Sequence, residues 1–220
     1  MNYTELSSAI QAYTENTETN FVAEIPVFVQ QAEQRIYNSV QFPSIRKNVT
    51  GTTTINNKSL QCPTDFLATY SLAVIDAAGA YEYLLNKDVN FIRQAYPTPA
   101  DTGTPKYYAL FGPRSDNAAE LTFILGPTPD AAYSSELHYY FYPPSITVSP
   151  YTSWLGDNFD TVLLYASLVE AYTYMKGEPD MMALYNGKYQ EALALAKRLG
   201  DGLERGDAYR DGQTKIRVTT

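Results

Sequence analysis

Residues that carry out chemistry are scarce in this sequence of 220 residues, which has one cysteine, one histidine and one tryptophan. The single cysteine, Cys62, excludes an intrachain disulfide and gives no sign of a secretory history. A Ser–His–Asp or Cys–His catalytic site would have to use His138. The sequence contains neither a nucleophile elbow nor the context of a reactive cysteine, so a histidine-based active site is not expected.

Long hydrophobic runs and an excess of positive charge are also missing. No apolar run approaches the ~20 residues that a membrane helix requires, and the polar start MNYTELSSA is not that of a signal peptide. We therefore expect a soluble protein, made in a host cytoplasm, with no membrane partner. The net charge of −8 argues against a surface built to grip the phosphates of nucleic acid.

Each candidate for a chemical site has a simpler structural interpretation. His138 lies in a strand-like aromatic run, where a half-buried sheet residue is more common than a ligand, and Cys62 indicates a small buried thiol. The spacing of Asp201, Glu204 and Asp207 departs from the known calcium loop, and no glycine-rich phosphate loop occurs. A pair of glycosidase carboxylates would leave no local signature, so that alternative stays open. We predict a protein that is not an enzyme, with no catalytic residues, no cofactor and no metal.

Tyrosine is the abundant residue type, with 20 tyrosines against 9 phenylalanines. Tyrosine suits both half-buried strands and wet interfaces between proteins. The composition therefore favours a protein with extensive surface contacts.

The stretch from Asp157 to Leu199 predicts two consecutive helices joined by a tight turn. The first begins with Asp157 or Asn158 as N-cap and ends at Lys176, with Gly177 in the left-handed conformation. Apolar residues three or four apart form a stripe that three leucines widen, and a helix this apolar is normally buried against several neighbours. The stripe contains Phe159, Val162, Tyr165, Val169, Tyr172 and Met175, and the added leucines are Leu163, Leu164 and Leu168.

The second helix of this hairpin starts at Pro179, where the missing N–H of proline costs nothing. Gly187 marks either a close helix crossing or a surface glycine tolerated at ~1 kcal/mol relative to alanine. The residues expected to be buried are Met181, Leu184, Tyr185, Ala192, Leu195 and Leu199. Those left for solvent or a partner are Lys188, Gln190, Glu191, Lys197 and Arg198.

Two amphipathic helices are predicted near the N-terminus. In the first, Asn2 to Thr14, Asn2 and Glu5 have the spacing of a capping box. The polar run TENTETN connects it to the second, which runs from Glu24 to Val40 with Pro26 in its first turn. The apolar face of this second helix contains Ile25, Phe28, Val29, Ala32, Ile36 and Val40.

From Asn48 onward the pattern changes to alternation with many turn residues. Two short strands are predicted around Asn56 and Asn57, and a strand pair around Asp76 to Gly79. A small helix from Asp88 to Ala95 is expected to bring Phe91 and Ile92 inward. Three further strands are predicted at KYYALF, ELTFIL and SSELHYYFY.

The sequence therefore predicts an α+β protein: a helical bundle with an inserted small antiparallel β domain and an extended C-terminal tail. The expected parts are the N-terminal helices of the bundle at 1–47, the inserted β-rich domain at 48–150, the C-terminal helical hairpin at 151–199 and the tail at 200–220. In the tail, Ile216 and Val218 alternate with polar neighbours, the pattern of a strand that pairs with a sheet edge of a partner. A disordered end without a role is the equal alternative.

Five segments, taken in order, resemble the head-to-tail adaptor (connector) proteins of tailed bacteriophages over about Glu24 to Leu199. They are FVQQAEQRIYNSV, LQCPTDFLATYSL, KYYALFGPR, LHYYFYPPSI and WLGDNFDTVLLYASLVEAYTYMKGEPDMMALYNGKYQEAL. The resemblance implies a structural virion protein of the head–tail junction, with helices packed as a bundle and an appended β domain.

The same resemblance implies the partners of the chain. It implies a ring of about twelve copies that binds the portal protein and a tail tube or nozzle protein. Genomic DNA is implied to pass through the ring without tight binding. The alternative is a virion or surface binding module that uses the tyrosine-rich β domain for carbohydrate or protein recognition.

Overall fold

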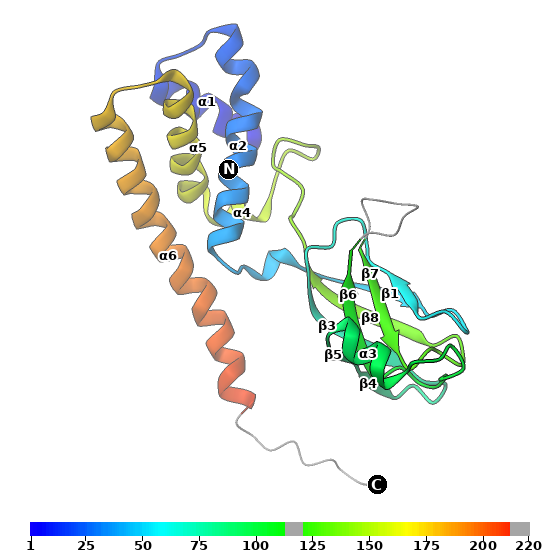
Figure 1. Cartoon of the computed structure of the whole chain (residues 1–220). Helices are drawn as coiled ribbons and strands as arrows, with labels where there is room; N and C mark the ends of the chain where they lie inside the picture. Colours follow the sequence, from blue (N-terminus) through cyan, green and yellow to red (C-terminus); the bar gives the residue numbers. More distant parts are fainter. Residues whose placement is uncertain (113–120, 212–220) are drawn as a thin grey trace. The chain divides into compact units, whose positions relative to one another are not determined.

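The computed structural model describes the backbone of residues 1–112 and 121–211, and the side chains of residues 1–112 and 121–199. The chain divides into two compact units. The helical unit contains Met1–Ile45 and the chain from Pro143 onward, and the strand unit contains Arg46–Tyr142. Helices and two small sheets together confirm the predicted α+β class (Figure 1).

The helical unit begins with α1, Tyr3–Thr14, and α2, Thr19–Ser39. The predicted capping box is present: the Asn2 side chain accepts from the Glu5 N–H at 2.9 Å, and the Glu5 carboxylate accepts from the Asn2 N–H at 3.0 Å. Helix α2 starts five residues earlier than predicted, so Pro26 lies inside it rather than in its first turn. The earlier start buries Phe21, whose ring contacts Phe28.

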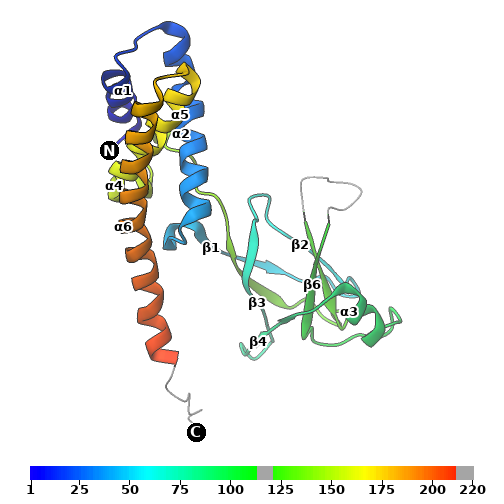
Figure 2. The same ribbon diagram turned by 60° about the vertical axis from the view of Figure 1, so that its left-hand side comes forward.

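Helix α5, Asp160–Met175, packs against α1, α2, α4 (Trp154–Asn158) and α6 (Pro179–Asp211). Figures 1 and 2 show α5 beside both α2 and α6. The buried residues of α5 include two alanines and a serine, and the Ser167 hydroxyl is satisfied by the Leu163 carbonyl at 2.8 Å. These small side chains let neighbouring helices approach closely. The buried set is Val162, Leu163, Ala166, Ser167, Leu168 and Ala171.

The predicted N-terminus of this helix is wrong, because the chain bends at Phe159. Ser153 caps the short helix α4, and Phe159 stands between α4 and α5 with non-helical backbone angles. The Phe159 ring lies 5.1 Å from that of Phe42 and 5.5 Å from that of Trp154, centroid to centroid. Packing in this aromatic cluster offsets the lost helical hydrogen bonds.

The turn between α5 and α6 also differs in detail from the prediction. Lys176, not Gly177, takes the left-handed conformation, with φ of 54°. Glycine is still required at 177, since a Cβ atom there would lie 2.5 Å from the Tyr172 ring. Pro179 begins α6 as predicted.

Three of the α6 residues predicted to be buried are instead exposed: Leu184 by 51%, Leu195 by 61% and Leu199 by 52%. The buried side chains of α6 lie on a face rotated by about 100° from these three leucines. They are Tyr185, Tyr189, Ala192, Leu193 and Ala196. Tyr185 docks α6 through ring contacts with Tyr13, Tyr165 and Tyr172. Gly187 has nothing within 4 Å of an added Cβ, so it is a surface glycine and not a helix crossing.

The extended tail predicted from residue 200 is wrong as far as Asp211, because α6 continues through Gly200 to that residue. Helix α6 has 33 residues and runs past the N-terminal end of α5 (Figures 1 and 2). Glycines at 200, 202 and 206 each weaken a helix by ~1 kcal/mol, which made a break there a reasonable expectation. Ile216 and Val218 lie outside the described residues.

The strand unit contains two four-stranded sheets and one short helix among the described residues. Sheet A has the order β1-β8-β3-β4 and is antiparallel; sheet B has the order β2-β7-β6-β5, with β5 and β6 parallel. The strands are β1 Arg46–Thr52, β2 Ser59–Gln61, β3 Ala68–Ile75, β4 Tyr81–Tyr83, β5 Leu85–Asn86, β6 Tyr107–Phe111, β7 Thr122–Gly126 and β8 Ser134–Tyr140.

The predicted turns are found where the sequence placed them. Asn56 has a left-handed φ of 58°, although the flanking strands β1 and β2 belong to different sheets and do not pair. Strands β3 and β4 do pair, and the Asp76 carboxylate closes their turn by accepting from the Ala78 and Ala80 N–H groups.

The core of the strand unit lies between the two sheets. Every second side chain of a strand points into this core. The core includes Leu72 and Val74 from β3, Leu137 and Tyr139 from β8, and Phe123 from β7. Helix α3, Val89–Ala95, packs on the other face of sheet B through Ile92, Ala109 and Ile124. Ile92 is buried as predicted, but Phe91 is exposed by 41%, so only one of the pair points inward.

A buried carboxylate ties α2 to the chain that returns from the strand unit. Glu33 is almost fully buried and accepts a hydrogen bond from the Ile146 N–H at 2.9 Å. Burial raises the pKa of the Glu33 carboxyl, and hydrogen bonds from Ser145 and Ile146 oppose that rise. Ile146 is itself buried, so this contact fixes the returning segment within the helical unit.

Replacing Leu168 with Asp is expected to lower the free energy of unfolding by ~3–5 kcal/mol, because the fully buried position offers no partner for a charge. Leu195→Asp on exposed α6 surface is the matched control and should change stability by less than ~0.5 kcal/mol. Chemical denaturation followed by circular dichroism measures both. Equal destabilisation by the two variants would contradict the packing of α5.

Glu33→Gln is expected to change how stability depends on pH. Because the folded chain keeps the Glu33 proton where the unfolded chain has lost it, the contribution of Glu33 falls as pH rises above its ordinary pKa of 4.5. The neutral variant lacks this loss, so its stability relative to the unmodified chain should increase between about pH 4 and pH 7. Denaturant unfolding at a series of pH values tests this, and a difference independent of pH would argue against it.

Candidate interaction surfaces

The described residues contain no group of three or more His, Cys, Asp or Glu side chains that could hold a metal ion. His138 lies in β8, half-exposed, with its Nδ1 3.2 Å from the Ser71 hydroxyl and its Nε2 3.8 Å from the Glu136 carboxylate. Cys62 is buried, and burial raises the pKa of its thiol to about 12, far above that of a reactive cysteine. Both residues therefore have the structural roles that the sequence predicted.

One exposed surface is the outer face of sheet A, which we call the tyrosine face. It is formed by side chains of sheet A that point away from the core. They are Arg46, Tyr70, Tyr81, Tyr83, Glu136, His138 and Tyr140. Tyr81 is exposed by 52% and Tyr83 by 64%. The helix of the strand unit, α3, packs on sheet B instead. Among the described residues of the strand unit, no helix covers the tyrosine face.

Local irregularity and charge shape the tyrosine face. A β-bulge between Thr69 and Ser71 leaves Tyr70 on the same side as Tyr140, and their rings lie 6.0 Å apart. The Arg46 guanidinium lies over both rings, at 5.1 and 5.8 Å from their centroids. The neighbouring Glu136 carboxylate raises the pKa of the Tyr81 hydroxyl, chiefly by its charge. This face thus combines aromatic area with one cation and one carboxylate.

A second exposed surface runs along α6 and is called the leucine stripe. Leu184, Leu195 and Leu199 fall within about 60° of arc on one side of the helix. Lys188 and Glu191 lie between them and form an ion pair at 3.4 Å. Single exposed leucines are ordinary, but an aligned row on a helix is typical of a protein–protein contact.

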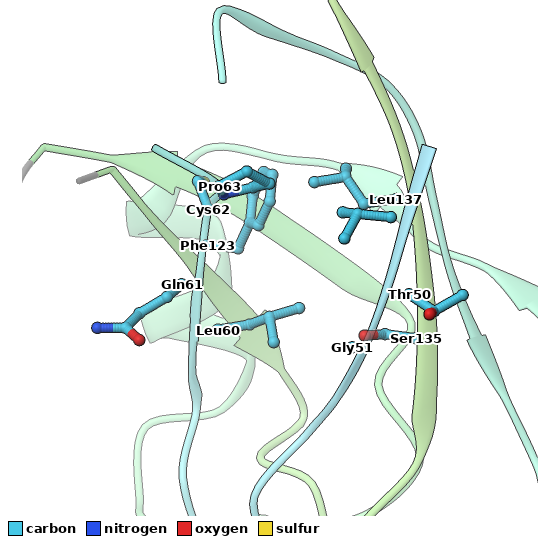
Figure 3. A pocket seen from close by; sticks show the side chains of 10 residues that line it. Thr50, Gly51, Leu60, Gln61, Cys62, Pro63, Phe123, Ser135 and Leu137 are labelled. Atoms are coloured by element: carbon cyan, nitrogen blue, oxygen red, sulfur yellow. The ribbon is translucent and has the colours of Figure 1, made fainter. Parts of the chain in front are cut away.

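The third feature is a cavity of about 260 Å³ between β1 and β2, called the β1–β2 seam. Figure 3 shows Leu60 and Phe123 of sheet B, with Cys62 just after β2, on one side and Gly51, Ser135 and Leu137 of sheet A on the other. The lining is mostly apolar, without a cluster of titratable groups. The seam suits an apolar side chain better than a polar substrate.

The sequence predicted tyrosine-rich contacts only from composition and did not locate them. The alternation of Tyr81 and Tyr83, and of His138 and Tyr140, was the signal that could have placed them on one sheet face. The leucine stripe was missed because those leucines were assigned to the core. The predicted interaction residues Ile216 and Val218 lie outside the described part of the chain.

Among the helices described, none is both long enough and apolar enough to cross a membrane. The two exposed apolar surfaces, on separate units, are of the kind that contacts other proteins.

Comparison with known families identifies the kind of structural protein. The family model described as SU10 adaptor protein matches residues 1–215, and the chain belongs to this family of phage adaptor proteins. The resemblance to tailed-phage adaptors is thereby confirmed, and family membership makes the chain a virion component that associates with portal and tail proteins. The comparison with curated proteins gives no match.

The purified protein is expected to be catalytically inert. His138 lies in a sheet surface beside the Ser71 hydroxyl and the Glu136 carboxylate, and the sequence around Ser71, TYSLA, is not that of a nucleophile elbow. A broad screen of ester, peptide, glycoside and nucleotide hydrolysis should give equal background rates for the unmodified chain and for His138→Gln. Hydrolysis that disappears in the variant would overturn this expectation.

Proposed function

We propose that this chain is a head-to-tail adaptor that forms a ring, joins the capsid portal to the tail and lets DNA pass. The observation that supports this most strongly is the family match, which spans residues 1–215 and so includes both units. We further propose that the helices of the helical unit form the bundle of the ring and that the strand unit is its appended β domain.

The leucine stripe supports ring formation. A closed ring requires two different, complementary patches on each subunit, because every copy contacts one neighbour on each side. The leucine stripe supplies one such patch: it is apolar, lies on a helix anchored to α5, and carries the Lys188–Glu191 pair that would add orientation. Burying three leucines contributes roughly 1.5–3 kcal/mol each at a fully desolvated contact.

The tyrosine face supports contact with a further protein. Tyr70, Tyr81 and Tyr83 offer large side chains with few rotatable bonds, which are enriched at protein interfaces. On an adaptor, this face would serve the portal protein or the tail tube or nozzle protein. Carbohydrate or protein recognition by a virion or surface binding module is the second candidate function, and the same exposed tyrosines favour it.

The charge of the chain supports passage of DNA. With a net charge of −8, the subunit repels phosphates overall and lacks the excess cations of a DNA-gripping protein. A channel through which the genome must pass benefits from weak adhesion.

Electron microscopy of the purified chain, with and without rings of the portal protein of the same phage, tests the proposal. Rings on the portal are expected for the unmodified chain. Leu195→Asp should abolish or strongly reduce them while leaving the melting temperature unchanged, because it places a charge in an exposed apolar contact.

The control variant is Ala194→Asp, which is also exposed but lies about 100° away around α6. It should form rings normally. A chain that remains monomeric with and without portal, yet is retained on immobilised glycans through its tyrosine face, would favour the second candidate function.

The assembled ring is expected to bind duplex DNA weakly at physiological salt, because the net negative charge leaves few counterions to release. Fluorescence anisotropy with a labelled duplex at several salt concentrations measures this. Tight binding with a steep dependence on salt would contradict passage without adhesion.

A further inference from the structure

The two sheets of the strand unit are joined at one end and open at the other. Strands β4 and β5 are connected through the single residue Leu84, so the two sheets meet there. At the opposite ends of the two sheets, β1 pairs only with β8 and β2 only with β7 among the described strands. An edge strand leaves alternate backbone N–H and C=O groups unpaired, which makes it a template for a further strand.

The open end is also where the cavity of the strand unit lies. Its volume of about 260 Å³ exceeds the ~150 Å³ apolar cavity that holds a benzene molecule. Leu60, Phe123 and Leu137 line it with apolar surface, as Figure 3 shows. On the β1 side the wall is low, because Gly51 has no side chain and the Val49 side chain is partly exposed. A strand lying along β1 could place side chains in this space.

The C-terminal segment 213–220, QTKIRVTT, has the pattern that this edge requires. It contains no proline or glycine and is rich in β-branched residues, which favour strands. Ile216 and Val218 are two residues apart and therefore face the same side of a strand, as Val49 and Gly51 do on β1.

Charge complements this pattern. Lys215 and Arg217 give the segment two positive charges and no negative ones, in a chain whose net charge is −8. With Ile216 and Val218 in the cavity, these cations would face the outer side of sheet A. There Glu136 pairs directly with Thr50 of β1, so a carboxylate lies one strand away.

We propose that residues 213–220 of one copy add as a strand to the free edge of β1 in a second copy, with Ile216 and Val218 filling the β1–β2 seam. The choice of a second copy rests on the proposed ring. Segment 213–220 follows helix α6, which is 33 residues long, roughly 50 Å, and runs past the N-terminal end of α5 (Figures 1 and 2). In a ring, a neighbour stands at a fixed position to receive it.

The native cysteine makes the contact testable in the full chain, because Cys62 lines the seam. One protein carries Ile216→Cys with Cys62→Ser, so its only thiol is on the segment. This thiol is activated as a pyridyl disulfide and the protein is mixed with the unmodified chain, whose only thiol is Cys62. Non-reducing electrophoresis then detects a disulfide between two copies.

The matched control replaces Ile216→Cys with Arg217→Cys, which faces the other side of the strand. We expect several times more cross-linked dimer from position 216 than from position 217. Cross-linking that occurs equally from both positions overturns the proposal. So does a protein with Ile216→Cys and intact Cys62 that forms its disulfide only within one chain when oxidised alone.

A second measurement does not depend on thiol reactivity. A fluorescent peptide of residues 212–220 is titrated into the full chain carrying Ile216→Asp and Val218→Asp, whose own segment cannot fill the seam. Binding is expected, and the same two substitutions in the peptide should weaken it at least about tenfold, whereas Thr219→Asp in the peptide should not. Absence of both cross-linking and peptide binding overturns the proposal.

Failure of this inference is distinguishable from failure of the proposed function. Rings on the portal without peptide binding or cross-linking would leave the adaptor function intact and reject strand addition. Peptide binding by a chain that never forms rings would retain strand addition and reject the ring.

Discussion

Burial of α5 on several sides at once is the constraint on which the helical unit depends. Because α1, α2, α4 and α6 all contact this helix, its surface must be apolar nearly all round, and small residues must stand where neighbours come closest. Ala166, Ser167 and Ala171 meet the second requirement. The long helices α2 and α6 therefore present their outer sides to the surroundings, and the leucine stripe is a direct result of α6 being held by one face only.

In the strand unit, too, one element is in contact with neighbours on both sides. Strand β8 is paired on both sides, by β1 and β3, and gives one set of side chains to the core and the alternate set to the tyrosine face. Helix α3 packs on the outer face of sheet B, whereas no described helix packs on the outer face of sheet A. Each unit therefore stabilises itself with one surface and leaves another apolar surface exposed among its described residues.

Much of the fold could be predicted from local sequence patterns, because a few adjacent residues determine them. Examples are the capping box at Asn2 and Glu5, the turn at Asp76 and the start of α6 at Pro179. The incorrect predictions concern helix boundaries and buried faces that are determined by tertiary packing. The break at Phe159 depends on Phe42, more than a hundred residues away, and the choice between Leu193 and Leu195 for the core depends on how α6 is rotated against α5. Interaction surfaces were harder still, because an exposed leucine and a buried one look alike in a sequence.

The insertion of the strand unit between Ile45 and Pro143 has a consequence for synthesis. As the chain leaves the ribosome, α1 and α2 appear first, yet the helix that covers their apolar faces is encoded more than a hundred residues later. The strand unit is complete before α5 emerges, so it is able to fold while Leu6, Phe28 and Ile36 still lack the helix that buries them. Because α5 and α6 follow the strand unit in the chain, the apolar faces of α1 and α2 cannot be covered until the strand unit has been made.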